Sequence, residues 1–195
     1  MARFTRIVCP VDLSEWSQRA VDHAMAIAHW HGAQVFVLHV HQLVAPALVA
    51  APALAAESFQ VIRLSDGERA QLEAALRARV TADAAAGVSV STAVVEEFNV
   101  PDTIVSYAED VGADLITVAT HGRSGFKRFV LGSVAEHLLR AARCPVLVVP
   151  PHVHDAVPRA PVAYQRIVCP VDFSDASVRS LSVATSLAAE AGGRV

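Results

Sequence analysis

Residues 6–12 read Arg-Ile-Val-Cys-Pro-Val-Asp, a short apolar run that ends in a proline and a carboxylate. A run of this length between turn residues is typical of a buried strand. A helical pattern follows at once, because apolar residues recur at helical spacing from Ser14 to His31 and Gly32 supplies a stop. The stretch therefore predicts a strand over Phe4–Cys9 and a helix directly after it.

The alternation of strand and helix patterns continues outward from this stretch to residue 150. Strand patterns cover Val35–Val40, Val88–Val95, Leu115–Ala119 and Val146–Val149; helix patterns begin at Ser65 and cover Pro101–Val111 and Ser133–Ala142. Residues 42–62 read as a long loop rich in Ala, Pro and Val. Strands rich in Val and Ile that alternate with helices predict a doubly wound α/β fold, with a mainly parallel sheet covered on both faces.

The opening stretch returns unchanged as residues 166–172. When residues 6–35 are aligned with 166–195, 14 of the 30 positions are identical. Residues 151–163 lie between the two copies, are rich in proline, and read as a linker. We therefore expect one complete unit at 1–150 and the opening strand and helix of a second unit at 164–195.

The composition argues against several classes of function. Apolar residues make up 53% of the chain, while a net charge of −3 leaves no basic excess for binding nucleic acid. The most apolar stretch, 35–56, is interrupted by polar residues and prolines, so we expect no membrane span. Three widely spaced cysteines and an N-terminus without a signal-peptide pattern predict a reducing, cytoplasmic environment.

In open α/β sheets, ligands bind beyond the carboxyl ends of the strands, where the strand order reverses. The segment after the fourth predicted strand carries three glycines and three basic side chains: Gly122, Gly125, Gly132, Arg123, Lys127 and Arg128. Ser133 followed by Glu136 predicts a capping box, and so a helix N-terminus whose N–H groups and dipole favour a phosphate. The open alternative is a glycine-rich loop with solvated basic residues. The spacing matches neither a P-loop nor a dinucleotide-binding turn.

Three motifs resemble those of the universal stress proteins. They are Ile-Val-x-Pro-Val-Asp-x-Ser at 7–14, Thr-His-Gly-Arg-Ser-Gly at 120–125, and Gly-Ser-Val-Ala-Glu-x-Leu-Leu-Arg-x-Ala-x-Cys-Pro-Val-Leu-Val-Val at 132–149. The resemblance covers residues 4–150, and the copy at 164–195 matches the opening again. It implies a Rossmann-like sheet of the adenine nucleotide alpha hydrolase type, with strand order 3-2-1-4-5.

The resemblance also implies a site for ATP, with Mg²⁺ as a further expectation. Many family members bind ATP through Gly-x2-Gly-x9-Gly-Ser/Thr, and this chain has Ala119 at the first glycine position. By position, the Asp12 carboxylate is expected near the nucleoside and Val40 at the adenine. Phosphate contacts are expected from Gly122, Gly132, Ser133 and Val134, and the predicted site also includes Pro10, Val11, Arg123 and Gly125. For Asp12, capping of the helix near Ser14 is an open alternative.

The expected function is an ATP-binding stress-response or signalling module whose nucleotide state modulates dimerisation or partner binding. Because Asp12 is the one obvious acidic residue at the strand ends, we expect slow hydrolysis or none. A nucleotide-free interaction protein of the same fold and a slow ATPase are the alternatives. Family members commonly dimerise through the closing strand, which implies a homodimer through Val146–Val149. His39 and His41 lack a third ligand at metal spacing, so no metal site is expected.

Overall fold

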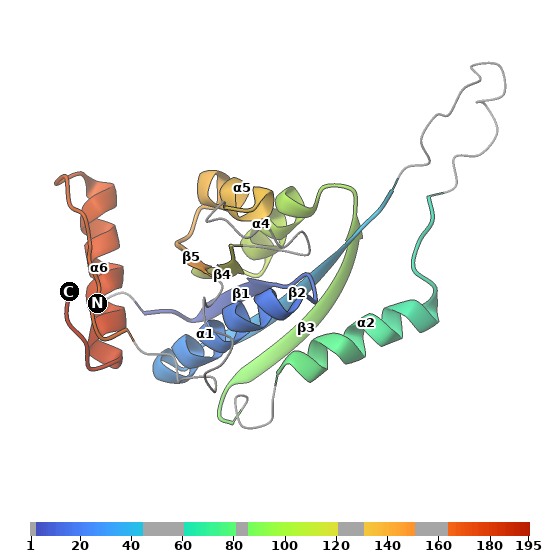
Figure 1. The fold of residues 1–195 in the computed structure, drawn as a ribbon, viewed down its shortest axis with the longest axis horizontal. Coiled ribbons are helices and arrows are strands. Elements are labelled where there is room, and N and C mark those ends of the chain that lie inside the picture. The colour runs from blue at the N-terminus through green and yellow to red at the C-terminus, as the bar shows by residue number, and fades with distance from the viewer. Residues whose placement is uncertain (1–2, 45–60, 81–85, 121–130, 151–163) are drawn as a thin grey trace, which may run out of the picture.

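The computed structural model describes residues 3–44, 61–80, 86–120, 131–150 and 164–195. Within these residues, five strands form one parallel sheet in the order β3-β2-β1-β4-β5 (Figure 1). The strands are β1 (Arg6–Pro10), β2 (Gln34–Gln42), β3 (Ser89–Glu97), β4 (Leu115–Ala119) and β5 (Val146–Val149). The predicted α/β fold and strand order are confirmed.

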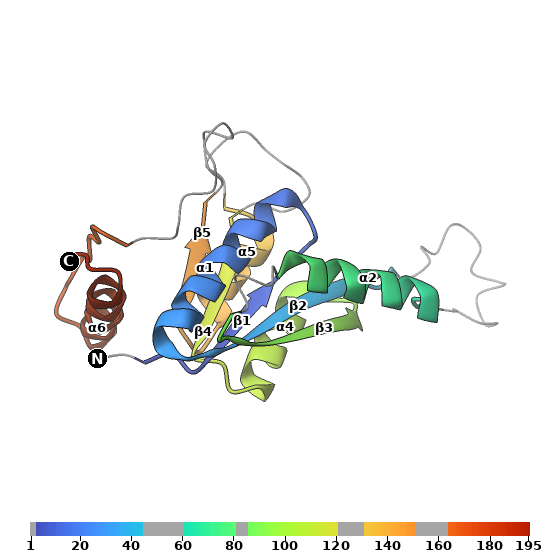
Figure 2. The same ribbon diagram turned by 90° about the horizontal axis from the view of Figure 1, so that it is seen from below.

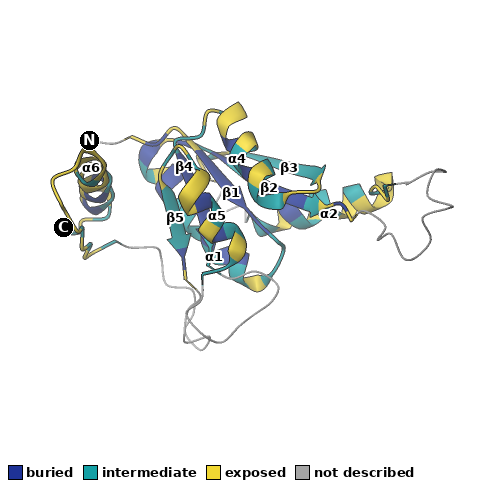
Figure 3. Cartoon of the chain, turned by 90° about the horizontal axis from the view of Figure 1, so that it is seen from above, coloured by how far each residue is buried: buried dark blue, intermediate teal, exposed yellow. Residues whose placement is uncertain are grey.

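Helices cover both faces of the sheet. On one face lie α1 (Glu15–His31) and α2 (Asp66–Arg79), and on the other lie α4 (Val100–Asp110) and α5 (Ser133–Ala141) (Figure 1). Each pair packs over its own buried cluster, which we call the α1-side and the α4-side cluster. Figure 3 shows the buried central strands between these helices. Two such covered faces are what near-continuous Val/Ile strands require.

Local signals explain where the helices begin and end. Ser14 and Ser65 are the N-caps of α1 and α2, and the backbone N–H of Glu68 donates to the Ser65 hydroxyl. Gly32 ends α1 in the left-handed region (φ 67°), which glycine adopts without steric cost. The predicted bounds are therefore correct to within one or two residues.

The first strand begins at Arg6, not at Phe4 as predicted. The first cross-strand pair joins Arg6 to Gln34. Just before it, the Thr5 N–H donates to the Asp114 carboxylate (2.7 Å) instead of to a neighbouring strand. Phe4 is nevertheless buried, with its ring edge-on to His31 at 5.1 Å. Its side chain belongs to the core although its backbone does not belong to the sheet.

The second copy forms its helix but not its strand. Helix α6 spans Asp175–Glu190, whereas residues 166–171 make only one isolated bridge, between Arg166 and Arg194. The predicted strand does not form there, because within the described ranges no further strand pairs with these residues, and a single parallel pair gives little stability. Val168 is consequently 94% exposed, while its counterpart Val8 is fully buried.

Residues 164–195 nonetheless contact helix α1 of the first unit. Figure 2 shows α6 at this side of the molecule. The Tyr164 hydroxyl lies 2.5 Å from His23 Nδ1, and its ring packs edge-on against Trp30. Val183 and Leu187 of α6 pack against the α1-side cluster.

No helix in the described part of the chain combines the length and hydropathy needed to span a membrane.

Candidate functional site

A cavity of about 650 Å³ lies at the carboxyl ends of β1, β2 and β4. The chain proceeds from β1 to β2 and β3 on one side and returns to β4 and β5 on the other, so the strand order reverses between β1 and β4. This is the position at which open α/β sheets bind ligands. Seven residues of the predicted site line the cavity together: Pro10, Val11, Asp12, Val40, Gly132, Ser133 and Val134. Gly122, Arg123 and Gly125 lie outside the described residues.

Asp12 occupies the turn that joins β1 to α1. Its Oδ1 accepts hydrogen bonds from the Ser14 N–H (3.1 Å) and the Ser14 hydroxyl (2.6 Å). Leu13, between them, is in the left-handed region at φ 64°. Asp12 Oδ2 is buried and has no hydrogen-bond partner among the described residues. One carboxylate oxygen therefore fixes the turn, and the other remains available as an acceptor in a residue that lines the cavity.

The helix N-terminus on the opposite side of the cavity differs from the prediction. Ser133 and Glu136 do not form a capping box, because Gly132 is the N-cap of α5 and Ser133 is its first helical residue. The Gly132 N–H donates to the Thr120 carbonyl oxygen (2.7 Å), and α5 begins at Ser133 as predicted, with Gly132 instead of Ser133 as its N-cap. Glu136 pairs with Arg140 instead, at 2.7 Å. Because no side chain in the described part of the chain caps them, the first N–H groups of α5 can bind an anion.

Gly132 is required by a close approach of two backbone segments. A Cβ atom built on it would lie 2.8 Å from the Thr120 carbonyl oxygen. Its φ of −68° is ordinary, so steric clearance, and not backbone conformation, excludes a side chain here.

Buried apolar side chains form another part of the cavity lining. Leu38 and Val40 come from β2, Ile104 from α4, and Val118 from β4. Apolar walls with a few directed polar groups are typical of small-molecule sites. Ile104 and Val118 could not be identified as site residues from the sequence, because helix and strand periodicity mark a side chain as buried without saying what it faces.

His39 also belongs to this site, through a contact that the sequence did not predict. Its imidazole is buried, and Nδ1 lies 2.9 Å from the Val11 carbonyl oxygen. In the sequence, His39 stands out only together with His41, as a pair of candidate metal ligands. Both histidines line the cavity. The described residues contain no group of three or more His, Cys, Asp or Glu side chains placed to hold a metal ion.

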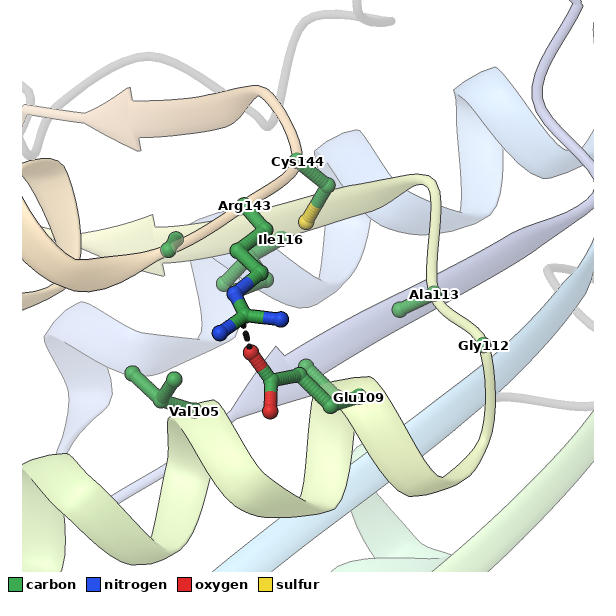
Figure 4. A pocket seen from close by; sticks show the side chains of 9 residues that line it. Val105, Glu109, Gly112, Ala113, Ile116, Arg143 and Cys144 are labelled. Carbon is green, nitrogen blue, oxygen red and sulfur yellow. Dashed lines mark ion pairs between the residues drawn. The ribbon is translucent and has the colours of Figure 1, made fainter.

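A second cavity, of about 330 Å³, lies beside α4 and the segment that leads into β5 (Figure 4). There, Glu109 Oε1 and Arg143 Nε form an ion pair at 3.1 Å. The neighbouring Cys144 is half-buried, and burial raises the pKa of its thiol. Burial likewise raises the pKa of the Cys9 thiol, to about 12. Neither thiol is therefore set up for thiolate chemistry.

Comparison with known proteins agrees with this geometry. Residues 3–150 match the Universal stress protein family. A universal stress protein of Methanocaldococcus jannaschii is 39% identical over 147 residues, which are 75% of this chain and 82% of that protein. One from Thermus aquaticus is 30% identical over 146 residues, covering 75% and 98% of the two chains.

Solved structures show the same fold. The universal stress protein UspA from Lactobacillus plantarum has a TM-score of 0.59 at 28% identity, covering 76% of this chain and 99% of that one. A universal stress protein solved in complex with cAMP has a TM-score of 0.53 at 24% identity, covering 76% and 98%. From the matched residues, the shared sheet and the identity to the curated relatives, the chain belongs to the universal stress protein family.

Proposed function

We propose that this protein binds ATP at the carboxyl edge of its sheet, and that nucleotide occupancy modulates its dimerisation or its binding to a partner. One observation carries the proposal. Across a single cavity, the Oδ2 of Asp12, which has no hydrogen-bond partner among the described residues, is combined with the N-terminus of α5, which no described side chain caps. A nucleotide presents matching chemistry, since its ribose hydroxyls donate hydrogen bonds and its phosphates accept them.

The phosphates would lie at α5. The N–H groups of the first turn, from Ser133 and Val134 onward, have no intrahelical acceptor, and the positive end of the helix dipole favours anions. Both residues line the cavity. Gly122, Arg123 and Gly125 belong to the proposed site by their positions in the family motif.

The nucleoside would lie over β1 and β2. Asp12 Oδ2 accepts a hydrogen bond from a ribose hydroxyl, and the main chain at Val40 contacts the adenine. Leu38, Ile104 and Val118 provide the apolar surface that a base requires.

Slow hydrolysis, or none, follows from the acidic residues at this site. Among the described lining residues, Asp12 is the single carboxylate. Mg²⁺ prefers oxygen ligands and commonly binds through one or two carboxylates together with substrate phosphates. Because both Asp12 oxygens are assigned to Ser14 and to the ribose, a Mg²⁺ ion would depend on the phosphates of ATP for its binding at this site. The three free cysteines accord with a reducing, cytoplasmic compartment.

Mass spectrometry of the ligand released from purified, denatured protein tests the proposal directly, together with calorimetric titration by ATP, AMP and cAMP. We expect ATP to be recovered or to bind, and light scattering to change on its addition. If the folded protein neither carries nor binds an adenine nucleotide at millimolar concentration, it is a nucleotide-free interaction protein instead.

Replacing Ala119 with glycine restores the first glycine of the family motif. Ala119 lines the cavity, but it also packs against the α1-side cluster. We expect a modest gain in ATP affinity and a loss of about 1 kcal/mol in the free energy of unfolding, since a strand glycine costs entropy and packing. Ala93→Gly, in β3 and outside the cavity lining, is the matched control: it should lose stability without changing affinity. A weaker affinity in Ala119→Gly would contradict the expected approach of phosphate.

We infer that the protein dimerises through β5, which lies at the edge of the sheet. The Ile116 and Thr120 N–H groups donate to the carbonyl oxygens of Pro145 and Val149, at 3.0 Å each. Because backbone groups alternate in direction along a strand, those of Val148 face the open edge. An unpaired edge of this kind pairs readily with a second strand.

Val148→Pro removes one N–H from that open edge and leaves the pairing with β4 in place. We expect the wild-type protein to be a dimer by light scattering and the variant to be a monomer with a similar thermal midpoint. Val148→Thr keeps the N–H and should remain dimeric. A dimeric Val148→Pro variant would place the interface elsewhere.

A further inference from the structure

His39 fixes the backbone directly before Asp12. A carbonyl oxygen can only accept, so the Nδ1 that lies 2.9 Å from the Val11 carbonyl carries the hydrogen and donates it. On the other side of the same residue, the Val11 N–H donates to the Leu38 carbonyl oxygen (2.8 Å). Both backbone polar groups of Val11 are thus bound to β2. They hold the chain where it leaves β1.

His39 continues a row of β2 whose preceding side chains are buried and apolar. Side chains alternate between the two faces of a strand, and Val35 and Val37, in the same row as His39, are fully buried in the α1-side cluster. A leucine or valine would continue this row without any polar atom to satisfy. A buried imidazole is costly unless its hydrogen bond is used. Here that bond goes to the peptide group that links Val11 to Asp12.

We propose that His39 is a positioning residue for nucleotide binding, which sets the orientation of the Asp12 carboxylate through the Val11 carbonyl. This inference rests on the proposed function. The Val11–Asp12 peptide is held by His39 on one side, and Asp12 Oδ1 is held by Ser14 on the other. These two restraints leave Oδ2 as the acceptor that meets the ribose. Loosening the His39 restraint would let the carboxylate turn away while the fold and the phosphate end remain.

The test uses a matched pair of substitutions in the full chain. The amide nitrogen of asparagine can replace imidazole Nδ1, whereas that of glutamine lies too far out along the side chain. We expect His39→Asn to bind ATP close to the wild-type level and His39→Gln to bind about 10-fold more weakly, which is the effect of losing one well-oriented hydrogen bond to a charged group. His39→Leu should resemble His39→Gln. If the leucine variant fails to fold, the asparagine–glutamine pair still decides.

A double-mutant cycle with Asp12→Ala separates positioning from general support of the site. If His39 acts through Asp12, the loss from His39→Gln should vanish when Asp12 is already alanine. Inorganic triphosphate, which probes only the α5 end, should bind both His39 variants like the wild type. Additive losses in the cycle, an equal loss in His39→Asn, or a parallel loss of triphosphate binding would each overturn the positioning role.

The failure of the proposed function has a different signature. If the wild-type protein does not bind ATP, the nucleotide site is wrong, and the role of His39 is refuted with it. If the wild type binds ATP and the cycle is additive, the site is retained and only the positioning role is refuted.

Discussion

Replacing Gly132 with valine is expected to reduce ATP affinity by at least about 100-fold, the equivalent of losing two charge-assisted hydrogen bonds to phosphate. Any side chain at this position places a Cβ 2.8 Å from the Thr120 carbonyl oxygen. Thr120 cannot retreat easily, because its N–H donates to the Val149 carbonyl oxygen of β5 at 3.0 Å. The first turn of α5 must therefore move, and its N–H groups move with it. Calorimetric titration with ATP measures the loss.

Gly67→Val provides the matched control. Gly67 lies in the first turn of α2, where an added Cβ would meet nothing within 4 Å. This variant should bind ATP like the wild type, and thermal unfolding should show both proteins folded. If Gly132→Val is folded and keeps wild-type affinity, the phosphates do not bind at the N-terminus of α5.

Asp12→Asn should weaken ATP binding by about 10- to 100-fold, because it replaces a charged hydrogen-bond acceptor with a neutral amide. The buried Oδ2 of Asp12 has no other described partner to compensate for the change. The loss should be smaller for a 2′,3′-dideoxy analogue of ATP, which lacks both ribose hydroxyls. Affinity for ATP and for this analogue can be compared in the same titration series.

The chain contains its own control for Asp12. Asp172 occupies the same position in the second copy, where its Oδ1 accepts from the Ser174 N–H at 3.0 Å and Phe173 repeats the φ of 64° seen at Leu13. The hydrogen bonds from Ser174 lower the pKa of Asp172 to about 2. Asp172→Asn should leave ATP affinity unchanged, since Asp172 is exposed and does not line the cavity. An equal loss in both variants would show that the effect does not come from the proposed site.

The capping of two helices shows how far local sequence predicts local structure. Ser65 and Ser133 are each followed three residues later by glutamate. At Ser65 the capping box forms, with the Ser65 N–H donating to Glu68 at 2.8 Å. At Ser133 it does not, because Gly132 is bound to the Thr120 carbonyl and takes the N-cap position. A contact between residues distant in sequence therefore overrides the motif.

Site residues were also predictable to different degrees, because some of their contacts join residues that are distant in sequence. Asp12 and Gly132 follow strand ends, and the carboxyl ends of parallel strands meet at one edge of a sheet, so their proximity could be expected. The contact of His39 with the Val11 carbonyl could not, because it depends on how β2 lies against β1. Nor could the sequence show that Oδ1 of Asp12 binds Ser14 while Oδ2 has no described partner, because this difference depends on the folded turn.

The two identical stretches, 6–12 and 166–172, separate what sequence alone determined from what tertiary structure decided. In both copies the aspartate accepts from the serine two residues later, the residue between them is left-handed, and a helix follows. These features need only bonds within a few residues, so the same sequence produces them twice. Only the first copy becomes a strand, with Val8 fully buried while Val168 is 94% exposed. A strand needs hydrogen-bonding partners beside it, and those come from β2 and β4, which pair with the first copy alone.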